Sequence, residues 1–196
     1  MLFYPESAPV PEELRTEDFL LRPLRATDVE LDYEAVIESR ALLRRWAGGS
    51  WPSDDFTLAD NLSDLELHER EHLDREAFTY TVMNPTETEC LGCVYITPLE
   101  RLLRQANASE AELSRVGEYE GVVRFWARAS RLTDNLDQRL LDTLEAWFSR
   151  EWAFSRVVYR TSENDPRQPQ LLAGKGYGLL YTLDIPGRTG RYLIYG

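Results

Sequence analysis

The chain alternates between two patterns of hydrophobic and polar positions. Segments in which apolar residues recur every three or four positions predict amphipathic helices, and they span residues 29–45, 58–77 and 136–154. Short runs rich in β-branched and aromatic residues predict strands, and they span residues 19–24, 78–83, 90–97, 120–129, 156–161, 179–185 and 192–195. This order predicts an α+β fold of mixed α/β character, in which helices flank one central, mixed and mostly antiparallel sheet.

Two helix starts carry the pattern of a capping box, in which a hydroxyl and an acidic side chain bond each other's backbone amides. These pairs are Thr27 with Glu30, and Thr57 with Asp60. Each pair predicts that a helix begins at the following residue. A shorter helix is expected around Leu171-Leu172.

Prolines and polar residues divide the rest of the chain. The first 14 residues contain three prolines, which predicts an irregular N-terminal arm at 1–14. Residues 15–196 are expected to form one domain. The polar segment 98–116 is expected to be a helical insertion within that domain.

Composition and charge narrow the classes of function. The 196 residues are 43% hydrophobic and 29% charged, an ordinary mixture for a globular protein. With 22 basic and 34 acidic residues the net charge is −12, so neither nucleic acid nor an anionic membrane is expected as a partner. No apolar run is long enough to span a bilayer, and the N-terminus lacks the pattern of an export signal. The chain is therefore expected in the cytoplasm, with both cysteines reduced.

Three motifs follow one another along the predicted elements. Leu20-Leu21-Arg22-Pro23-Leu24 precedes Asp28-Val29, and Leu91-Gly92-Cys93 lies in the third strand. Near the end, Thr161-Ser162-Glu163-Asn164 is followed by Leu171-Leu172 and Gly176-Tyr177. In content and order these motifs resemble the GCN5-related N-acetyltransferase (GNAT) superfamily, in its ribosomal-protein-acetyltransferase-like branch. The resemblance covers nearly the whole chain.

The resemblance implies an N-acetyltransferase that uses acetyl-CoA as cosubstrate. The acetyl group would pass by direct attack to a primary amine of a small molecule, peptide or protein. A single GNAT-like domain also implies a V-shaped split between the fourth and fifth strands, into which the pantetheine arm inserts. The pyrophosphate would bind at the N-terminus of the next helix. The cofactor-binding residues implied in this way are Phe125, Trp126, Ala127, Arg128, Arg131, Thr133, Asp134, Asn135, Leu136 and Asn164.

The pyrophosphate loop departs from the family pattern. Thr133-Asp134-Asn135 stands where the family has glycines, although Asn135 can adopt the left-handed conformation that one glycine provides. Thr133 or Asp134 is expected to cap the helix, and a carboxylate there would repel phosphate. Three arginines, Arg128, Arg131 and Arg139, would offset this by pairing with phosphate. The alternative is a GNAT-fold binding or interaction module whose CoA site has decayed.

The resemblance leaves the catalytic residues open. Leu172 stands where many members have a tyrosine that serves as general acid. Glu118 and Glu120 are the candidates for a general base, and solvated glutamates at the start of a strand are the alternative.

The acceptor is expected near the first two helices. Trp46, Trp51 and Phe56 lie there beside an acidic helix, and aromatic rings with carboxylates would suit a cationic amine. Alternatively, the rings fasten a loop to the core and the acids face solvent. The chain is expected to be a monomer or a homodimer.

Two spacings suggest zinc. His68-Glu69-Arg70-Glu71-His72 matches the H-E-x-x-H motif of zinc hydrolases, and His68 and His72 are the only histidines. Cys90 and Cys93 would complete a structural site with them, but residues three apart on a regular strand face opposite sides. No metal is therefore expected, and a zinc protein built on the two histidines is the weakest alternative.

Overall fold

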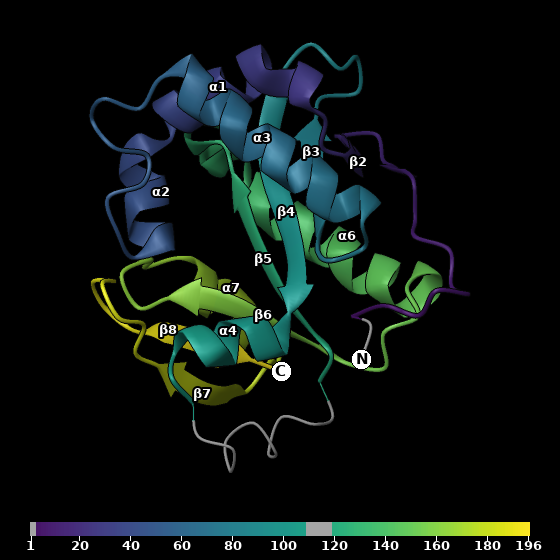
Figure 1. Cartoon of the computed structure of the whole chain (residues 1–196), viewed down its shortest axis with the longest axis vertical. Helices are drawn as coiled ribbons and strands as arrows, with labels where there is room; N and C mark the ends of the chain where they lie inside the picture. The colour runs from purple at the N-terminus through teal and green to yellow at the C-terminus, as the bar shows by residue number, and fades with distance from the viewer. Residues whose placement is uncertain (1–2, 109–118) are drawn as a thin grey trace.

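A computed structural model describes residues 3–108 and 119–196 of the chain (Figure 1). One eight-stranded sheet runs through it in the order β1-β2-β3-β4-β5-β6-β8-β7. The strands are β1 (Leu14–Arg15), β2 (Leu20–Pro23), β3 (Phe78–Met83), β4 (Cys90–Pro98), β5 (Gly121–Ala127), β6 (Val157–Ser162), β7 (Leu179–Leu183) and β8 (Tyr192–Tyr195). Only the β5–β6 pair is parallel, which confirms the predicted mixed and mostly antiparallel sheet.

Helices cover both faces of the sheet (Figure 1). One face packs against α1 (Val29–Glu38), α2 (Arg40–Ala47), α3 (Leu58–Leu73) and α4 (Leu99–Gln105). The other face packs against α6 (Leu136–Glu151) and α7 (Gln168–Gly174). The 3₁₀ helices η1 (Ala26–Asp28) and η2 (Ala129–Asp134) precede α1 and α6. None of the helices in the described ranges combines the length and the apolar character needed to cross a membrane.

The split between β5 and β6 is present. The two strands pair at only three positions, from Gly121 with Val157 to Val123 with Tyr159. Beyond Val123, β5 pairs only with β4, while β6 continues along β8. The predicted fourth and fifth strands therefore diverge toward their C-terminal ends, and the single GNAT-like domain with its V-shaped split is confirmed.

Two details of the first helices differ from the prediction. The single helix expected over 29–45 breaks at Ser39 into α1 and α2. The capping box is not formed by Thr27 and Glu30; the Asp28 carboxylate instead accepts from the Arg25 amide at 3.0 Å, and it also pairs with the buried Arg22. The second box is confirmed, since the Thr57 hydroxyl accepts from the Asp60 amide at 3.2 Å.

The N-terminal arm is irregular but fixed to the domain. Tyr4 is buried and packs edge-on against Phe78 and Trp152. The Arg75 guanidinium donates to the carbonyls of Pro5, Glu6 and Ala8. Of the predicted insertion at 98–116, residues 99–105 form α4, and residues 109–118 lie outside the described part of the chain.

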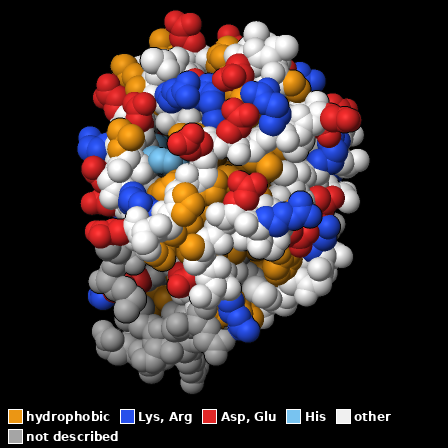
Figure 2. All heavy atoms as spheres, turned by 90° about the vertical axis from the view of Figure 1, so that its right-hand side faces the viewer, with side chains coloured by type: hydrophobic (Ala, Val, Ile, Leu, Met, Phe, Trp, Pro, Cys, Tyr) orange, Lys and Arg blue, Asp and Glu red, His pale blue; other side chains and the backbone are white. Residues whose placement is uncertain are grey.

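On the face shown in Figure 2 the negative charge is not gathered in one field. Figure 2 shows acidic and basic side chains interspersed on the face that it presents. Many exposed carboxylates pair with arginines, for example Glu13 with Arg15 and Glu163 with Arg191. The −12 charge thus gives no sign of a binding surface on this face.

Candidate functional site

A cavity of about 260 Å³ lies on the face of the sheet that α1, α2 and α3 cover. It is bounded by α2 and its following loop, α3, the four strands β4, β5, β6 and β8, and the β7–β8 loop. Its lining residues are Trp46, Ala47, Trp51, Asp64, Leu67, His68, Tyr95, Arg124, Arg160, Arg188 and Tyr192. Strand alternation explains the positions of Arg124 and Arg160. In β5, Val123 and Phe125 face α6, so Arg124 between them faces the cavity. In β6, Tyr159 faces α6, so the next residue, Arg160, also faces the cavity.

Arg160 is the most deeply buried charge in this cavity. Its side chain is 2% exposed, and its Nε and Nη2 atoms have no hydrogen-bond partner among the described residues. Its Nη1 atom lies 3.5 Å from the Trp46 carbonyl oxygen, and the guanidinium stacks on the rings of Tyr192 and Trp46 at 4.2 and 4.8 Å. Burial and the neighbouring Arg124 lower the pKa of Arg160 to about 9, so it stays cationic at neutral pH.

The cavity as a whole is cationic. Arg124 lies over the Tyr95 ring at 5.1 Å, its Nε atom lacks a partner, and burial lowers its pKa. Arg188 is the third guanidinium in the lining, and Asp64 is its one carboxylate. Asp64 accepts from the Trp51 indole at 3.3 Å, and burial raises its pKa. The lining thus combines aromatic rings with three guanidinium groups and one carboxylate, whereas the sequence predicted aromatic rings beside an acidic helix for a cationic amine.

The three predicted acceptor-side rings have different positions. Trp46 and Trp51 line the cavity. Phe56 does not line it, and instead packs edge-on against Trp51 with ring centres 6.0 Å apart. Apart from Asp64, the acidic residues of α3 lie outside the lining. The loop after α2 therefore supplies part of the cavity wall and is itself fastened by an aromatic contact.

A side chain from α7 bonds to β5 where β5 and β6 diverge. Gln168 is 6% exposed, and its Nε2 atom donates to the Phe125 carbonyl oxygen at 2.7 Å. Phe125 lies in the part of β5 that has left β6, where an inserted pantetheine arm would find its backbone partners. Trp126 and Ala127 are buried beside it, and the Trp126 indole donates to the Tyr95 hydroxyl at 3.4 Å.

Two amides of the loop that follows β5 bind side chains at the end of α1. The loop forms the 3₁₀ helix η2 rather than an open turn. The amides of Ala129 and Ser130 donate to the Ser39 hydroxyl and the Glu38 carboxylate at 3.0 and 3.1 Å. These backbone donors are therefore not free to bind a phosphate.

The arginines expected to bind phosphate are paired with carboxylates. Arg128 lies 2.6 Å from Glu38, Arg131 lies 2.6 Å from Glu89, and Arg139 pairs with Asp18 at 2.9 Å. The Arg128 guanidinium lowers the pKa of Glu38 to about 2. Each positive charge in this region is thus matched by a negative one.

A carboxylate does lie at the start of α6, but not the predicted one. Asp134 and Thr133 are exposed and do not cap the helix; Asn135 is the N-cap, in the expected left-handed conformation with φ of 55°. The buried carboxylate is Asp137 of the first turn, which accepts from the Gln138 amide at 3.0 Å and forms a two-pronged ion pair with Arg167. The sequence-based choice of Asp134 or Thr133 as cap is wrong because η2 continues through Asp134.

The remaining predicted site residues lie away from the cavity. Leu136 is a core residue, and Asn164 is exposed with its amide donating to the Thr189 carbonyl at 2.8 Å. Glu120 is exposed at the paired end of β5 and β6, where its carboxylate accepts from the Ser155 amide at 2.7 Å. Glu118 lies outside the described residues. Leu172, at the position of the family tyrosine, is buried.

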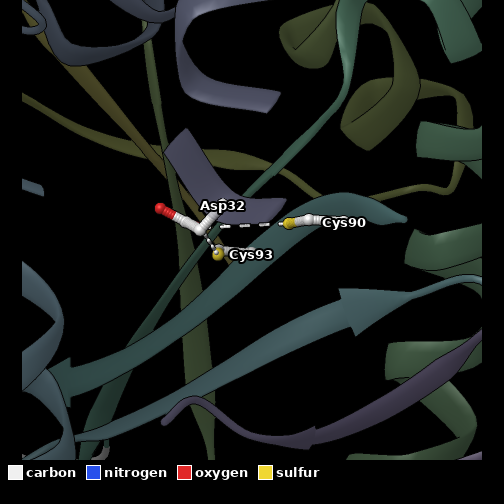
Figure 3. Close-up of side chains that lie close together, drawn as sticks. All are labelled: Asp32, Cys90 and Cys93. Atoms are coloured by element: carbon white, nitrogen blue, oxygen red, sulfur yellow. Dashed lines mark hydrogen bonds between the residues drawn. The ribbon is translucent and has the colours of Figure 1, made fainter. Parts of the chain in front are cut away.

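A second cluster of chemically capable groups lies under α1 (Figure 3). The Asp32 carboxylate faces both thiols, with Cys93 Sγ at 3.5 Å and Cys90 Sγ at 3.9 Å from its Oδ1 atom. The expectation that the two sulfurs face opposite sides is wrong because β4 contains a bulge at Leu91. Gly92 permits this geometry: its φ is 150°, and a Cβ there would lie 2.0 Å from the Trp126 carbonyl oxygen.

This cluster is the only group of three or more potential metal ligands that the described ranges bring together, and no histidine joins it. His72 lies instead between the rings of Phe78 and Tyr80, next to the Thr79 carbonyl. Burial raises the pKa of Asp32, and the neighbouring Cys90 and burial raise that of Cys93. The Cys93 thiol is therefore protonated and donates to Asp32. Among the described residues neither histidine joins the two cysteines as a ligand set for zinc.

Three residues of the cavity and the split, Arg124, Arg160 and Gln168, were not predicted from the sequence. Arg124 and Arg160 each interrupt a run of β-forming residues, in VVRFW and VVYR, and that was the available signal. A strand buried on both faces places every side chain against protein, so an arginine inside it needs a reason. Gln168 gives no such signal, because its partner is a backbone atom distant in sequence.

Solved structures share this fold at low sequence identity. The ribosomal L7/L12 α-N-protein acetyltransferase RimL, in complex with coenzyme A, aligns with a TM-score of 0.70 and 14% identity, over 94% of this chain and 96% of that chain. The ribosomal-protein-S5-alanine acetyltransferase from Vibrio fischeri aligns with a TM-score of 0.69 and 15% identity, over 94% and 95%. The microcin C7 self-immunity acetyltransferase MccE, with acetyl-CoA and AMP, aligns with a TM-score of 0.68 and 14% identity, over 95% and 96%.

No protein-family model and no curated protein matches the chain. The likeness therefore rests on structure, and it extends over nearly the full length of both chains in each comparison. The order of the strands, the split between β5 and β6 and these alignments agree with one another. The chain has the fold of the GNAT superfamily, in the form found in ribosomal-protein acetyltransferases.

Proposed function

We propose that this chain is a GNAT-fold binding protein whose ligand occupies the cavity beside the split and whose acyl-CoA site has decayed. The observation that carries the proposal is the 2.7 Å hydrogen bond from Gln168 Nε2 to the Phe125 carbonyl. It fills the split at the backbone position that a pantetheine arm would need. Displacing it would leave a buried carbonyl unsatisfied unless the cofactor replaced the bond.

The pyrophosphate side supports the same conclusion. At the start of α6 the buried Asp137 carboxylate holds Arg167 in an ion pair, so a pyrophosphate there would have to compete with Asp137 for this arginine. The arginines that would attract it are held by Glu38 and Glu89. Binding CoA would therefore require several ion pairs to break together.

A second candidate function is the acetyl transfer that the fold suggests. The unpaired ends of β5 and β6 favour it, and RimL and MccE carry coenzyme A or acetyl-CoA in their structures. In that case acetyl-CoA would be the cosubstrate and a primary amine the acceptor. Phe125–Arg128, the Arg131–Leu136 loop and Asn164 would bind the cofactor, and Glu118 or Glu120 would act as base. A location in the cytoplasm, and a monomeric or homodimeric state, stay predictions under either function.

Calorimetric titration with acetyl-CoA at physiological salt separates the two. The binding proposal predicts no heat of binding up to millimolar acetyl-CoA. Micromolar binding, followed by release of CoA in the presence of a panel of primary amines, would overturn it and support acetyl transfer.

Opening the site tests the reason for the decay. The double variant Gln168→Ala, Asp137→Asn removes both the side chain in the split and the buried carboxylate, and we expect it to gain measurable affinity for CoA. Gln170→Ala is the matched control, because Gln170 is an exposed glutamine on the same helix. Asp134→Gly should change nothing, since Asp134 is exposed and caps no helix. A gain in affinity for CoA with Asp134→Gly alone would indicate instead that the loop Thr133-Asp134-Asn135 prevents CoA binding.

A further inference from the structure

The cavity contains a buried cation without a counter-ion. Arg160 is 2% exposed, and two of its three guanidinium nitrogens have no hydrogen-bond partner among the described residues. Burying a charge without a partner costs several kcal/mol of folding free energy. Most buried polar groups in native proteins are satisfied, so each exception calls for a ligand, a water or a catalytic role.

Arg160 is not alone in this respect. Arg124 leaves its Nε atom unpartnered in the same cavity, and Arg188 adds a third guanidinium to the lining. Like charges repel, so collecting three of them around one space is unfavourable until an anion enters it. A planar guanidinium binds a carboxylate with two parallel hydrogen bonds, and Arg160 is a cavity-lining guanidinium with two nitrogens that have no partner among the described residues.

The walls define the body of the ligand. Trp46, Trp51, Tyr95 and Tyr192 surround the arginines with flat apolar surfaces. The Arg160 guanidinium carbon lies over the rings of Trp46 and Tyr192, at 4.8 and 4.2 Å from their centres. A cavity of about 260 Å³ suits a compact molecule.

We infer that this cavity binds a small planar organic carboxylate, whose carboxyl group pairs with Arg160 and Arg124 and whose flat body packs between the aromatic rings. The inference rests on the proposed binding function and names its ligand class. It reverses the charge expected for the ligand from the aromatic and acidic residues of the sequence. Asp64, the one carboxylate in the lining, accepts from the Trp51 indole, and no ion pair among the described residues joins it to an arginine.

Three probes of one shape test the charge. Benzoate, benzamide and benzylamine share a ring and differ in carrying a negative, a neutral and a positive group. We expect calorimetry at physiological salt to give saturable binding of benzoate to the full-length chain and none of the other two. Binding of benzylamine, or binding of none of the three, would overturn the inference. Inorganic phosphate is the fourth probe. Tighter binding of phosphate than of benzoate would contradict the inference that the ligand has a planar body.

Two substitutions assign the binding to the guanidinium groups. Arg160→Met keeps most of the side-chain volume and removes the charge, and it should weaken benzoate at least about tenfold, as expected for loss of charged hydrogen bonds. Arg124→Met provides the same test should the first variant fail to fold. Arg15→Met, on the distant edge strand β1, is the control and should bind as the wild type does. Unchanged benzoate affinity in both cavity variants would contradict the assignment.

The outcomes of the two proposals are distinguishable. If neither benzoate nor acetyl-CoA binds, the proposal of a decayed CoA site is supported and the proposal of a carboxylate ligand is contradicted. Micromolar binding of acetyl-CoA together with benzoate binding would keep the carboxylate site and make the carboxylate part of an acceptor substrate.

Discussion

Two groups of arginines in this structure differ in whether they are paired with carboxylates. At the end of β5, Arg128 and Arg131 form short ion pairs with Glu38 and Glu89. In the cavity, Arg160 is more deeply buried and yet lacks a carboxylate partner among the described residues. The family resemblance assigns the ligand phosphates to the first group. The geometry indicates that the first group is already neutralised and that the second is free to bind an anion.

The difference shows that the presence of arginines does not by itself indicate an anion site. A paired guanidinium in a partly exposed position contributes little net charge, and its partner must be displaced before an anion binds. An unpaired guanidinium between aromatic rings has already lost its water, so an incoming carboxylate supplies the hydrogen bonds that water formerly made. Burial and pairing together decide which group is functional.

The largest expected effect concerns the ion pair that closes the pyrophosphate side. Arg167→Met leaves the Asp137 carboxylate buried without its partner, and we expect a loss of about 2 kcal/mol in the free energy of unfolding, reduced from the cost at a fully buried pair because Arg167 is partly exposed. Urea denaturation measures it, with Arg15→Met as the surface control. A loss no larger than the control's would mean that the pair does not hold the site closed.

The hydrogen bond in the split is expected to have the next largest effect. Gln168→Ala leaves the Phe125 carbonyl unsatisfied in the core, which should lower the free energy of unfolding by about 1.5 kcal/mol. Urea denaturation of Gln168→Ala and of the exposed control Gln170→Ala should differ by that amount. Equal stability of the two variants would show that water readily replaces the glutamine and that the split is open.

A substitution in the cavity is expected to change the free energy of unfolding in the opposite direction. Arg160→Met removes an unpaired buried cation while keeping the packing of the side chain, so the ligand-free variant should be as stable as the wild type or more stable by about 1 kcal/mol. Thermal and urea unfolding without ligand provide the measurement. A destabilisation above about 2 kcal/mol would identify Arg160 as a structural residue and remove the contrast between the two groups.

The smallest effect concerns pH. Because Arg128 lowers the pKa of Glu38 from 4.5 to about 2 in the folded state, the pair stabilises the protein above pH 4.5 and the contribution is lost as the pH falls toward 2. The carboxylate is exposed, so solvent screening keeps this contribution below about 1 kcal/mol. Glu38→Gln should flatten the acid side of the stability curve. A curve identical to that of the wild type would indicate that the pair is not formed in solution.

The helices and strands could be predicted from the sequence because local patterns largely determine them. The alternation from Phe78 to Met83 matches β3 residue for residue, and the Thr57 capping box forms as expected. The break at Ser39 and the bulge at Leu91 depend on tertiary packing, so no local pattern reveals them. The aromatic part of the cavity was foreseen in Trp46 and Trp51.

The charge of the site could not be foreseen for a related reason. Arginines are read from the sequence one at a time, but whether each is paired depends on partners far along the chain. Arg131 meets Glu89 across 42 positions, and Arg167 meets Asp137 across 30. Arg160 and Arg124, by contrast, form no ion pair with any carboxylate of residues 3–108 and 119–196, and a sequence does not reveal a missing partner.

The most direct test of this contrast places both ligands on one preparation of the wild-type protein. Benzoate and acetyl-CoA are titrated separately by calorimetry at physiological salt, and each titration is repeated with Arg160→Met. The account predicts saturable benzoate binding that Arg160→Met weakens at least about tenfold, and no binding of acetyl-CoA up to millimolar concentration. Micromolar binding of acetyl-CoA with no binding of benzoate would contradict it on both sides of the split.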